Sequence, residues 1–197
     1  MSIRKTVLTL LNECMGYLTT KAAKEKGIDN KSLQRLVECG LLERVAHGLY
    51  IGVDIIPDPF VVTQYRCPKG IFSHEAALFL HDLSERVPLR LTMTIPSGWN
   101  SQLLKDENFL FFYCKPYLLG LGVCAIETPA GLKVNTFDKE RTLCDCLRNS
   151  EKMDMDLVLS ALKQYMKSPV KDNAKLLKYA DTFKIRDMVR RYIEVLS

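Results

Sequence analysis

Charged and amide side chains gather on one face of a predicted helix over residues 30–39, near the N-terminus. Because successive residues of a helix are rotated by about 100°, Lys31, Gln34, Arg35 and Glu38 lie on one side while apolar residues occupy the other. Arginine and glutamine match the edges of guanine and adenine in the major groove, and lysine contacts phosphate. This face is therefore the strongest candidate for reading a DNA sequence.

Further candidate contacts come from the start of this helix and from the segments on either side of it. Asn30 and Ser32 lie at the helix N-terminus, where unpaired backbone N–H groups are expected to favour a phosphate. A short hairpin after the helix would carry more polar side chains near its tip. The full predicted set of DNA contacts is Thr20, Lys21, Asn30, Lys31, Ser32, Gln34, Arg35, Arg44, His47 and Tyr50.

Three helices followed by a hairpin are predicted to position these residues. Apolar residues at helical spacing indicate a first helix that Gly16 ends, and Asn30 is expected to cap the third. Residues 1–54 thus predict a winged helix-turn-helix domain, with Pro57–Pro59 as a linker. The predicted elements after the first helix are helices over residues 21–26 and 30–39 and strands over residues 42–45 and 49–51.

The charge of this region permits a polyanionic partner without requiring one. Residues 1–52 hold eight Lys and Arg against five Asp and Glu, which gives +3 of the formal net charge of +5. A three-helix module can also bind proteins, and a solvated helix face often carries Lys, Gln and Arg. Pattern alone therefore leaves a protein-interaction module open as the alternative to DNA binding.

The remaining residues, 55–197, predict a mixed α/β domain, so the expected fold class is α+β. Strand candidates alternate with turns between residues 89 and 135, and the chain is predicted to be helical from about residue 136 onward. Ser73 is expected to cap one helix of this domain, and either Thr136 or Asp138 to cap a later one.

Composition argues against several other classes of protein. Apolar residues make up 47% of the chain, as in ordinary globular proteins. No apolar run approaches the ~18–20 residues of a membrane helix, and no cleavage site follows the N-terminus, so a cytoplasmic location is expected. Seven scattered cysteines without a CxxC predict buried free thiols rather than disulfides or a zinc site. We expect neither a metal nor a cofactor.

Polar clusters outside the first domain are interpreted as structural. His74 and His81 share a helix face but lack a third metal ligand. Arg141 and Asp145 are spaced i, i+4 on a predicted helix and are expected to form an ion pair. Motifs for nucleotide binding or a catalytic nucleophile are absent, and the acidic residues lack the spacing of a nuclease, so no enzymatic activity is expected.

Cationic residues recur at helical steps near the C-terminus. Such a stripe is usually a solvated helix face. In a chain predicted to bind DNA, it is also a candidate for a second phosphate-contacting surface. Its members are Lys171, Lys175, Lys178, Arg186, Arg190 and Arg191.

Four segments, taken in order, resemble a known family. They are GYLTTKAAKEKGIDNKSLQRLVECGLLERVAHGLYI, IFSHEAALFLHDLSERVP, LRLTMTIP and NTFDKERTLCDCLR, which together span about residues 16–150. The ordered set resembles the AbiEi-type antitoxins of bacterial abortive-infection toxin–antitoxin systems, of type IV. No single segment is highly specific, whereas their order is.

The resemblance implies a function in two parts. The winged helix would repress the promoter of the protein's own operon at inverted repeats in double-stranded DNA, and the rest of the chain would be the antitoxin domain. The paired toxin would be a nucleotidyltransferase-like enzyme, often neutralised without a stable complex, in a system that protects against phage. The alternative is a module that directly binds and inhibits that toxin.

Two residues depart from the family pattern. His47 stands where the family often has arginine, and Asp82 stands where it has glycine. Histidine is largely neutral at pH 7, so the hairpin is expected to attract phosphate less strongly, or in a pH-dependent way.

Overall fold

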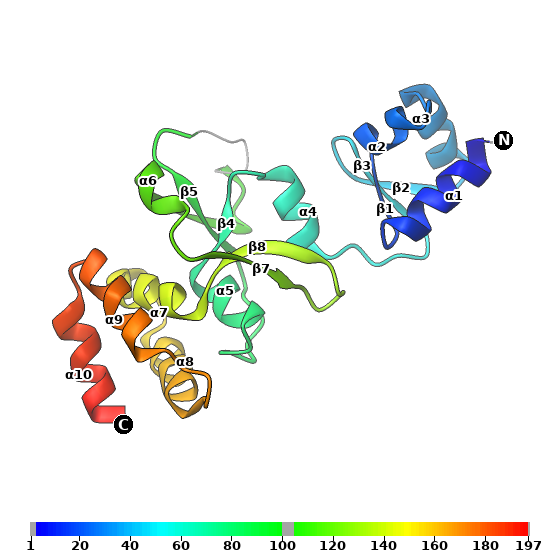
Figure 1. Ribbon diagram of the computed structural model, residues 1–197. Coiled ribbons are helices and arrows are strands. Elements are labelled where there is room, and N and C mark those ends of the chain that lie inside the picture. The colour runs from blue at the N-terminus through cyan, green and yellow to red at the C-terminus, as the bar shows by residue number, and fades with distance from the viewer. Residues whose placement is uncertain (1–2, 100–104, 197) are drawn as a thin grey trace. The chain divides into compact units, whose positions relative to one another are not determined.

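The computed structural model describes residues 3–99 and 105–196. Its mixture of helices and two sheets confirms the predicted α+β class. The described residues form two units: the first runs up to Pro68 and includes Pro129–Leu132, and the second contains the rest (Figure 1). The first unit therefore extends past residue 54, where the sequence analysis places the end of the first domain.

The first unit contains four helices and one three-stranded antiparallel sheet of order β1-β3-β2. The predicted helices and hairpin strands are all present, whereas β1 is a strand that the sequence analysis misses. The side chain of Thr19 caps α2 by accepting a hydrogen bond from the Ala22 N–H at 3.1 Å. The elements are α1 (Ile3–Glu13), β1 (Tyr17–Thr19), α2 (Thr20–Glu25), α3 (Asn30–Glu38), β2 (Leu42–Ala46), β3 (Leu49–Gly52) and α4 (Pro59–Arg66).

Alternation along the strands gives this sheet two buried faces. Leu18 pairs with Tyr50 in the register of β1 and β3, and both side chains belong to the core formed with α1, α2 and α3. The neighbouring pair, Tyr17 and Ile51, points the other way and belongs to a second apolar cluster with Leu49. If only α1, α2 and α3 covered the sheet, this second cluster on the opposite face would be exposed to solvent.

Helix α4 covers the second cluster. Val61 and Val62 pack against it, and Asp58 caps the helix by accepting hydrogen bonds from the N–H groups of residues 60 and 61. The Asp58 N–H donates in turn to the Tyr17 hydroxyl at 2.7 Å. The prediction of a linker at Pro57–Pro59 is therefore wrong, because Asp58 is buried and Pro59 is the first residue of the helix.

The second unit is built on a five-stranded mixed sheet of order β6-β5-β4-β8-β7. Strands β5 and β6 are parallel, as are β4 and β8, while the other pairs are antiparallel. Its elements are β4 (Ile71–Phe72), α5 (His74–Leu80), β5 (Leu91–Pro96), β6 (Phe109–Cys114), α6 (Pro116–Leu119), β7 (Val123–Glu127), β8 (Lys133–Phe137), α7 (Lys139–Arg148), a 3-10 helix (Ser150–Lys152), α8 (Met155–Lys167), α9 (Asn173–Thr182) and α10 (Arg186–Leu196).

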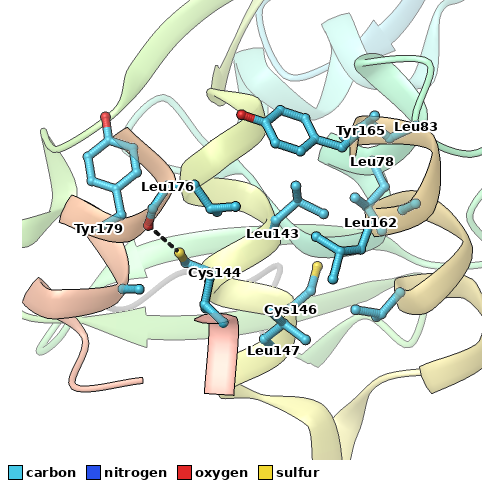
Figure 2. Packing of buried hydrophobic residues seen from close by; sticks show 14 of the residues in the cluster. Leu78, Leu83, Leu143, Cys144, Cys146, Leu147, Leu162, Tyr165, Leu176 and Tyr179 are labelled. Atoms are coloured by element: carbon cyan, nitrogen blue, oxygen red, sulfur yellow. Dashed lines mark hydrogen bonds between the residues drawn. The ribbon is translucent and has the colours of Figure 1, made fainter. Parts of the chain in front are cut away.

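Helix α7 is the centre of the second unit. All of its residues from Glu140 to Leu147 are buried, and Figure 2 shows Leu143 and Leu147 among side chains from the neighbouring helices. The Cys144 thiol donates a long hydrogen bond of 3.6 Å to the Leu176 carbonyl of α9. A helix buried on nearly every side forms the core against which α5, α8 and α9 pack.

Ser73 was predicted to cap α5, and either Thr136 or Asp138 was predicted to cap α7. Asp138 caps α7 by accepting from the Arg141 N–H at 2.8 Å, whereas Thr136 lies in β8. Ser73 occupies the cap position of α5, but its side chain makes no capping bond and instead accepts from the Thr94 hydroxyl at 2.9 Å.

Asp82 shows why the family pattern has glycine just after α5. Its φ of +56° lies in the left-handed region, which a glycine adopts without steric cost. Aspartate tolerates this conformation better than most residues, so the substitution preserves the turn.

Within the described residues, no helix is long and apolar enough to cross a membrane. All seven cysteines are free, as predicted. Four of them are buried, but Cys14 and Cys39 are exposed, so the prediction of buried thiols is wrong for these two.

Candidate nucleic-acid interface

A groove of about 1020 Å³ lies between α2, α3 and the β2–β3 hairpin of the first unit. We call it the α3 groove. Lys21 and Lys24 of α2 line one side, and Tyr65 of α4 also reaches it. Seven of the ten predicted DNA contacts line this groove: Thr20, Lys21, Asn30, Gln34, Arg44, His47 and Tyr50.

The other three predicted contacts lie outside the α3 groove. Lys31 and Arg35 are exposed on the adjoining outer face of α3, and Ser32 is half-buried. Gln34 lines the groove, and its side-chain amide donates a hydrogen bond to the Glu38 carboxylate at 3.1 Å. The predicted contacts of α3 are thus divided between residues that line the α3 groove and residues that lie outside it.

The N-terminus of α3 differs from the sequence prediction. Asp29, not Asn30, caps the helix, and its carboxylate accepts the Ser32 N–H at 2.8 Å. Hydrogen bonds from the Ser32 side chain and then from its backbone lower the pKa of Asp29. A carboxylate therefore occupies the helix end where the sequence analysis expects a phosphate, and its negative charge disfavours that contact.

The hairpin tip is held by three hydrogen bonds to one carbonyl. The Gly48 carbonyl accepts from the Thr20 N–H at 2.8 Å, from the Thr20 hydroxyl at 3.2 Å and from the Tyr65 hydroxyl at 2.9 Å. Gly48 has a φ of +76°, and a Cβ added there would lie 3.0 Å from the Tyr65 hydroxyl and 3.1 Å from that of Thr20. Glycine is therefore required at this position for both its conformation and its size.

His47 orients Arg44 on the exposed edge of the hairpin. The Arg44 guanidinium lies 3.0 Å from His47 Nδ1, and its Nε donates to the Ala46 carbonyl at 3.4 Å. Because a guanidinium can only donate, Nδ1 is the acceptor of this hydrogen bond. The arginine that the family often has at position 47 could not accept this bond, so the departure from the pattern has a structural role here.

Tyr50 forms part of the floor of the α3 groove and not of its rim. Its side chain is 8% exposed and belongs to the core of the first unit. Its part in the groove is therefore chiefly to support the surface residues above it.

Five residues that line the groove are not among the predicted DNA contacts: Lys24, Glu25, Val37, Gly48 and Tyr65. Lys24 follows Lys21 by three residues on α2, so the i, i+3 spacing could have identified it. Tyr65 lies 17 residues beyond Gly48, and no local pattern connects them.

The C-terminal cations have mostly intramolecular partners. The Lys175 ammonium lies 3.0 Å from Asp138 and 3.1 Å from Glu140, and Lys171 donates to the Met166 carbonyl at 2.7 Å. Lys171 precedes α9, so the predicted helical stripe is wrong in its first member.

Helix α10 shows the same pattern of internal pairing. Arg186 pairs with Asp181, Arg190 with Glu194 at 2.9 Å, and Arg191 donates to the Asp187 carbonyl at 3.3 Å. Lys178 is exposed. Whether these residues contact phosphate stays a prediction, but most of them already neutralise or cap other groups.

The two histidines of the second unit have the structural contacts expected of them. His74 is fully buried, stacks on the Phe112 ring at 3.5 Å between centroids, and bonds to Ser73 and Asn149. His81 Nε2 lies 2.6 Å from the Phe137 carbonyl. In the described ranges, no three His, Cys, Asp or Glu side chains gather in a way that could hold a metal ion.

The predicted Arg141–Asp145 ion pair is present and completely buried. The two side chains meet at 2.8 Å, with 0% and 1% of their surfaces exposed. Arg141 also donates to the carbonyls of Leu118 and Leu121, both at 3.0 Å. These contacts mark a structural network, since nothing of the pair is accessible to a macromolecular partner.

Comparison with known proteins supports the resemblance seen in the sequence. Residues 6–51 match a family model described as "Transcriptional regulator, AbiEi antitoxin", so the resemblance to this family is confirmed over those residues. They include α2, α3 and most of the hairpin. No curated protein matches the chain.

A solved structure shares the fold over most of the chain. The crystal structure of the Rv2827c protein from Mycobacterium tuberculosis is similar with a TM-score of 0.60 and 12% sequence identity, over 91% of this chain and 71% of that one. At this identity the likeness concerns the fold alone.

Proposed function

We propose that the first unit is a winged helix-turn-helix that binds double-stranded DNA, and that the protein is an antitoxin that represses its own operon. The observation that carries the proposal is the α3 groove, in which exposed cations from α2 and the hairpin flank α3. The family matched by residues 6–51 is described as a transcriptional regulator and antitoxin, which supports the same function.

Helix α3 is the element that would read the sequence. Gln34 and Arg35 are exposed near its middle, and their side chains suit adenine and guanine edges in the major groove. Lys31 is exposed on the same outer face, where it would contact a phosphate beside the groove. With α3 in the major groove of the DNA, Gln34 and Arg35 would specify bases, and Lys31 would position the protein on the backbone.

The hairpin would act as the wing. Arg44, held by His47, would contact a phosphate or enter the adjoining minor groove. Lys21 and Lys24 on α2 would face the DNA backbone between the wing and α3. Cations from α2 and from the hairpin on one concave surface are suited to a strand of phosphates.

The second unit would carry the antitoxin function, acting in the cytoplasm against a nucleotidyltransferase-like toxin encoded beside it. Its buried network around α7 is structural, so any antitoxin surface is formed by the exposed residues of the unit. Neutralisation without a stable complex is the route that the family resemblance favours. Direct binding of the toxin is the alternative outcome.

A binding titration tests DNA recognition. The full chain is titrated by fluorescence anisotropy against its own upstream region and a scrambled duplex, at two salt concentrations. The variant carrying Gln34→Ala and Arg35→Ala should lose most of the preference, since each good base contact discriminates by about 1–3 kcal/mol. A matched variant, Lys163→Ala with Lys167→Ala, removes two exposed cations of α8 and should keep the preference.

The result against this proposal is equally clear. If the wild type binds both duplexes with the same affinity, the first unit is a protein-interaction module instead. If the proposal holds, co-expression with the neighbouring toxin separates repression from antitoxin activity. The Gln34→Ala, Arg35→Ala variant should still rescue growth while failing to repress a promoter fusion.

A further inference from the structure

Tyr65 joins the hairpin tip to a helix outside the segment that resembles the antitoxin regulators. Its hydroxyl donates to the Gly48 carbonyl at 2.9 Å, from the last turn of α4. The same carbonyl accepts two bonds from Thr20 at the start of α2. One oxygen atom thus connects the hairpin, α2 and α4.

Helix α4 is itself fixed firmly enough to serve as a support. Asp58, 6% exposed, caps the helix and bonds through its N–H to the Tyr17 hydroxyl at 2.7 Å. Val61 and Val62 pack on the apolar cluster of the sheet face that α1, α2 and α3 leave uncovered. The position of Tyr65 is therefore determined by a buried polar contact at one end of α4 and by apolar packing along it.

We infer that α4 braces the wing and that Tyr65 is a positioning residue for DNA binding. The inference rests on the proposed function of the first unit. It extends the DNA-binding unit from residues 6–51 to residue 66, because the tip of the hairpin depends on a hydrogen bond from beyond that segment.

The chemistry of Tyr65 favours positioning over direct contact. A phenol has one proton to donate, and the Gly48 carbonyl receives it. The hydroxyl then has only lone pairs left to offer, which repel a phosphate oxygen. Tyr65, with 37% of its surface exposed, lines the α3 groove together with Arg44 and His47, and in this inference it acts on those two residues through the hairpin tip.

The test compares two Tyr→Phe variants of the full chain. Tyr65→Phe removes the hydroxyl but keeps the ring, and Tyr113→Phe makes the same change at an exposed tyrosine of β6 in the second unit. Without this bond the hairpin tip must be ordered when DNA binds, and this cost, at most that of one net hydrogen bond, should raise the Kd for the promoter about three- to tenfold in Tyr65→Phe. The slope of log K against log salt should also fall by about one, since a displaced wing loses a phosphate contact.

A measurement without DNA separates this inference from the proposed function. Hydrogen exchange of the Thr20 amide, which bonds to the Gly48 carbonyl at 2.8 Å, should be about three- to tenfold faster in Tyr65→Phe and unchanged in Tyr113→Phe. Circular dichroism confirms that both variants are equally folded at the assay temperature.

Each result decides one point. Unchanged amide exchange in Tyr65→Phe shows that α4 does not brace the hairpin and overturns the inference. Faster exchange with an unchanged Kd and salt slope also overturns it, because the brace would then not position a DNA contact. If the wild type does not prefer its promoter at all, the proposed function fails and takes the role of Tyr65 in DNA binding with it.

Discussion

Helices α3 and α7 carry similar charged residues in opposite surroundings. On α3, Lys31 and Arg35 are exposed at the surface of the first unit. On α7, Arg141 is 0% exposed and lies between the rings of Phe137 and Phe183, 4.3 and 4.4 Å from their centroids. Cationic side chains are therefore exposed in one unit, where we propose that they contact DNA, and buried in the structural network of the other.

The difference teaches that residue type and spacing do not by themselves identify a binding surface. The i, i+4 spacing of Arg141 and Asp145 predicts their ion pair correctly, and the C-terminal cations have spacing just as regular. What separates a contact surface from a structural network is whether the charges already have partners. In the α3 groove Lys21, Lys24 and Arg44 are exposed, and the contacts of Arg44 are with His47 and a carbonyl and not with a carboxylate, whereas on α7, α9 and α10 most of the cations pair with carboxylates.

The largest expected effect comes from breaking the α7 network. Arg141→Ala should lower the free energy of unfolding by about 3–5 kcal/mol, because it leaves the Asp145 carboxylate buried without its main partner. Urea denaturation measures this change. Arg186→Ala, which removes an exposed pair with Asp181, should cost about 1 kcal/mol or less. Similar losses in both variants would remove the contrast between the two units.

A second effect concerns the buried histidine beside this network. Burial, reinforced by the positive charges of Arg148 and Arg141, lowers the pKa of His74 to about 3. In the unfolded chain His74 takes up a proton near pH 6.5, whereas in the folded protein it stays neutral until the pH approaches 3. The contribution of His74 to the free energy of unfolding is therefore complete above pH 6.5 and is lost as the pH falls from 6.5 toward 3.

The expected slope from His74 is at most about 1.4 kcal/mol per pH unit. His74→Asn should flatten the dependence of unfolding free energy on pH between about 6 and 4, and asparagine tolerates the φ of +50° at this position. Urea titrations at several pH values provide the measurement. An identical slope in wild type and variant would show that other groups control acid sensitivity.

The smallest effect compares two exposed lysines, one from each unit. Lys21→Ala in the α3 groove should lower the salt slope of promoter binding by about one, with no loss of folding. Lys178→Ala on α9 should leave that slope unchanged, since the surrounding cations pair internally. A decrease for Lys178→Ala would instead establish the second phosphate-contacting surface that the sequence suggests.

Local sequence patterns predicted most elements of the first unit but not which element covers the second face of its sheet. Apolar spacing and glycines placed α1, α2, α3 and the hairpin close to their observed positions. Strand β1 was missed because three residues carry too little periodicity to be recognised. The role of helix α4 was not predicted, since the Tyr17–Asp58 and Gly48–Tyr65 bonds connect residues far apart in the sequence.

The candidate site was predicted as a set of residues and not as a surface. Seven of the ten residues line one groove, but a helical projection could not show that Lys31 and Arg35 lie outside it. The cap of α3 was misplaced by one residue because Asp29 and Asn30 are both good capping residues. That single step changes the charge at the helix end, and with it the expected phosphate contact.

The two-faced sheet of the first unit also affects when that unit is finished during synthesis. Leu132 packs on the cluster of Tyr17, Leu49 and Ile51, and it belongs to the first unit although it comes after half of the second. A nascent chain therefore lacks this covering until Leu132 has been translated. The ribosome delivers a complete first unit only once most of the sheet of the second unit has been made.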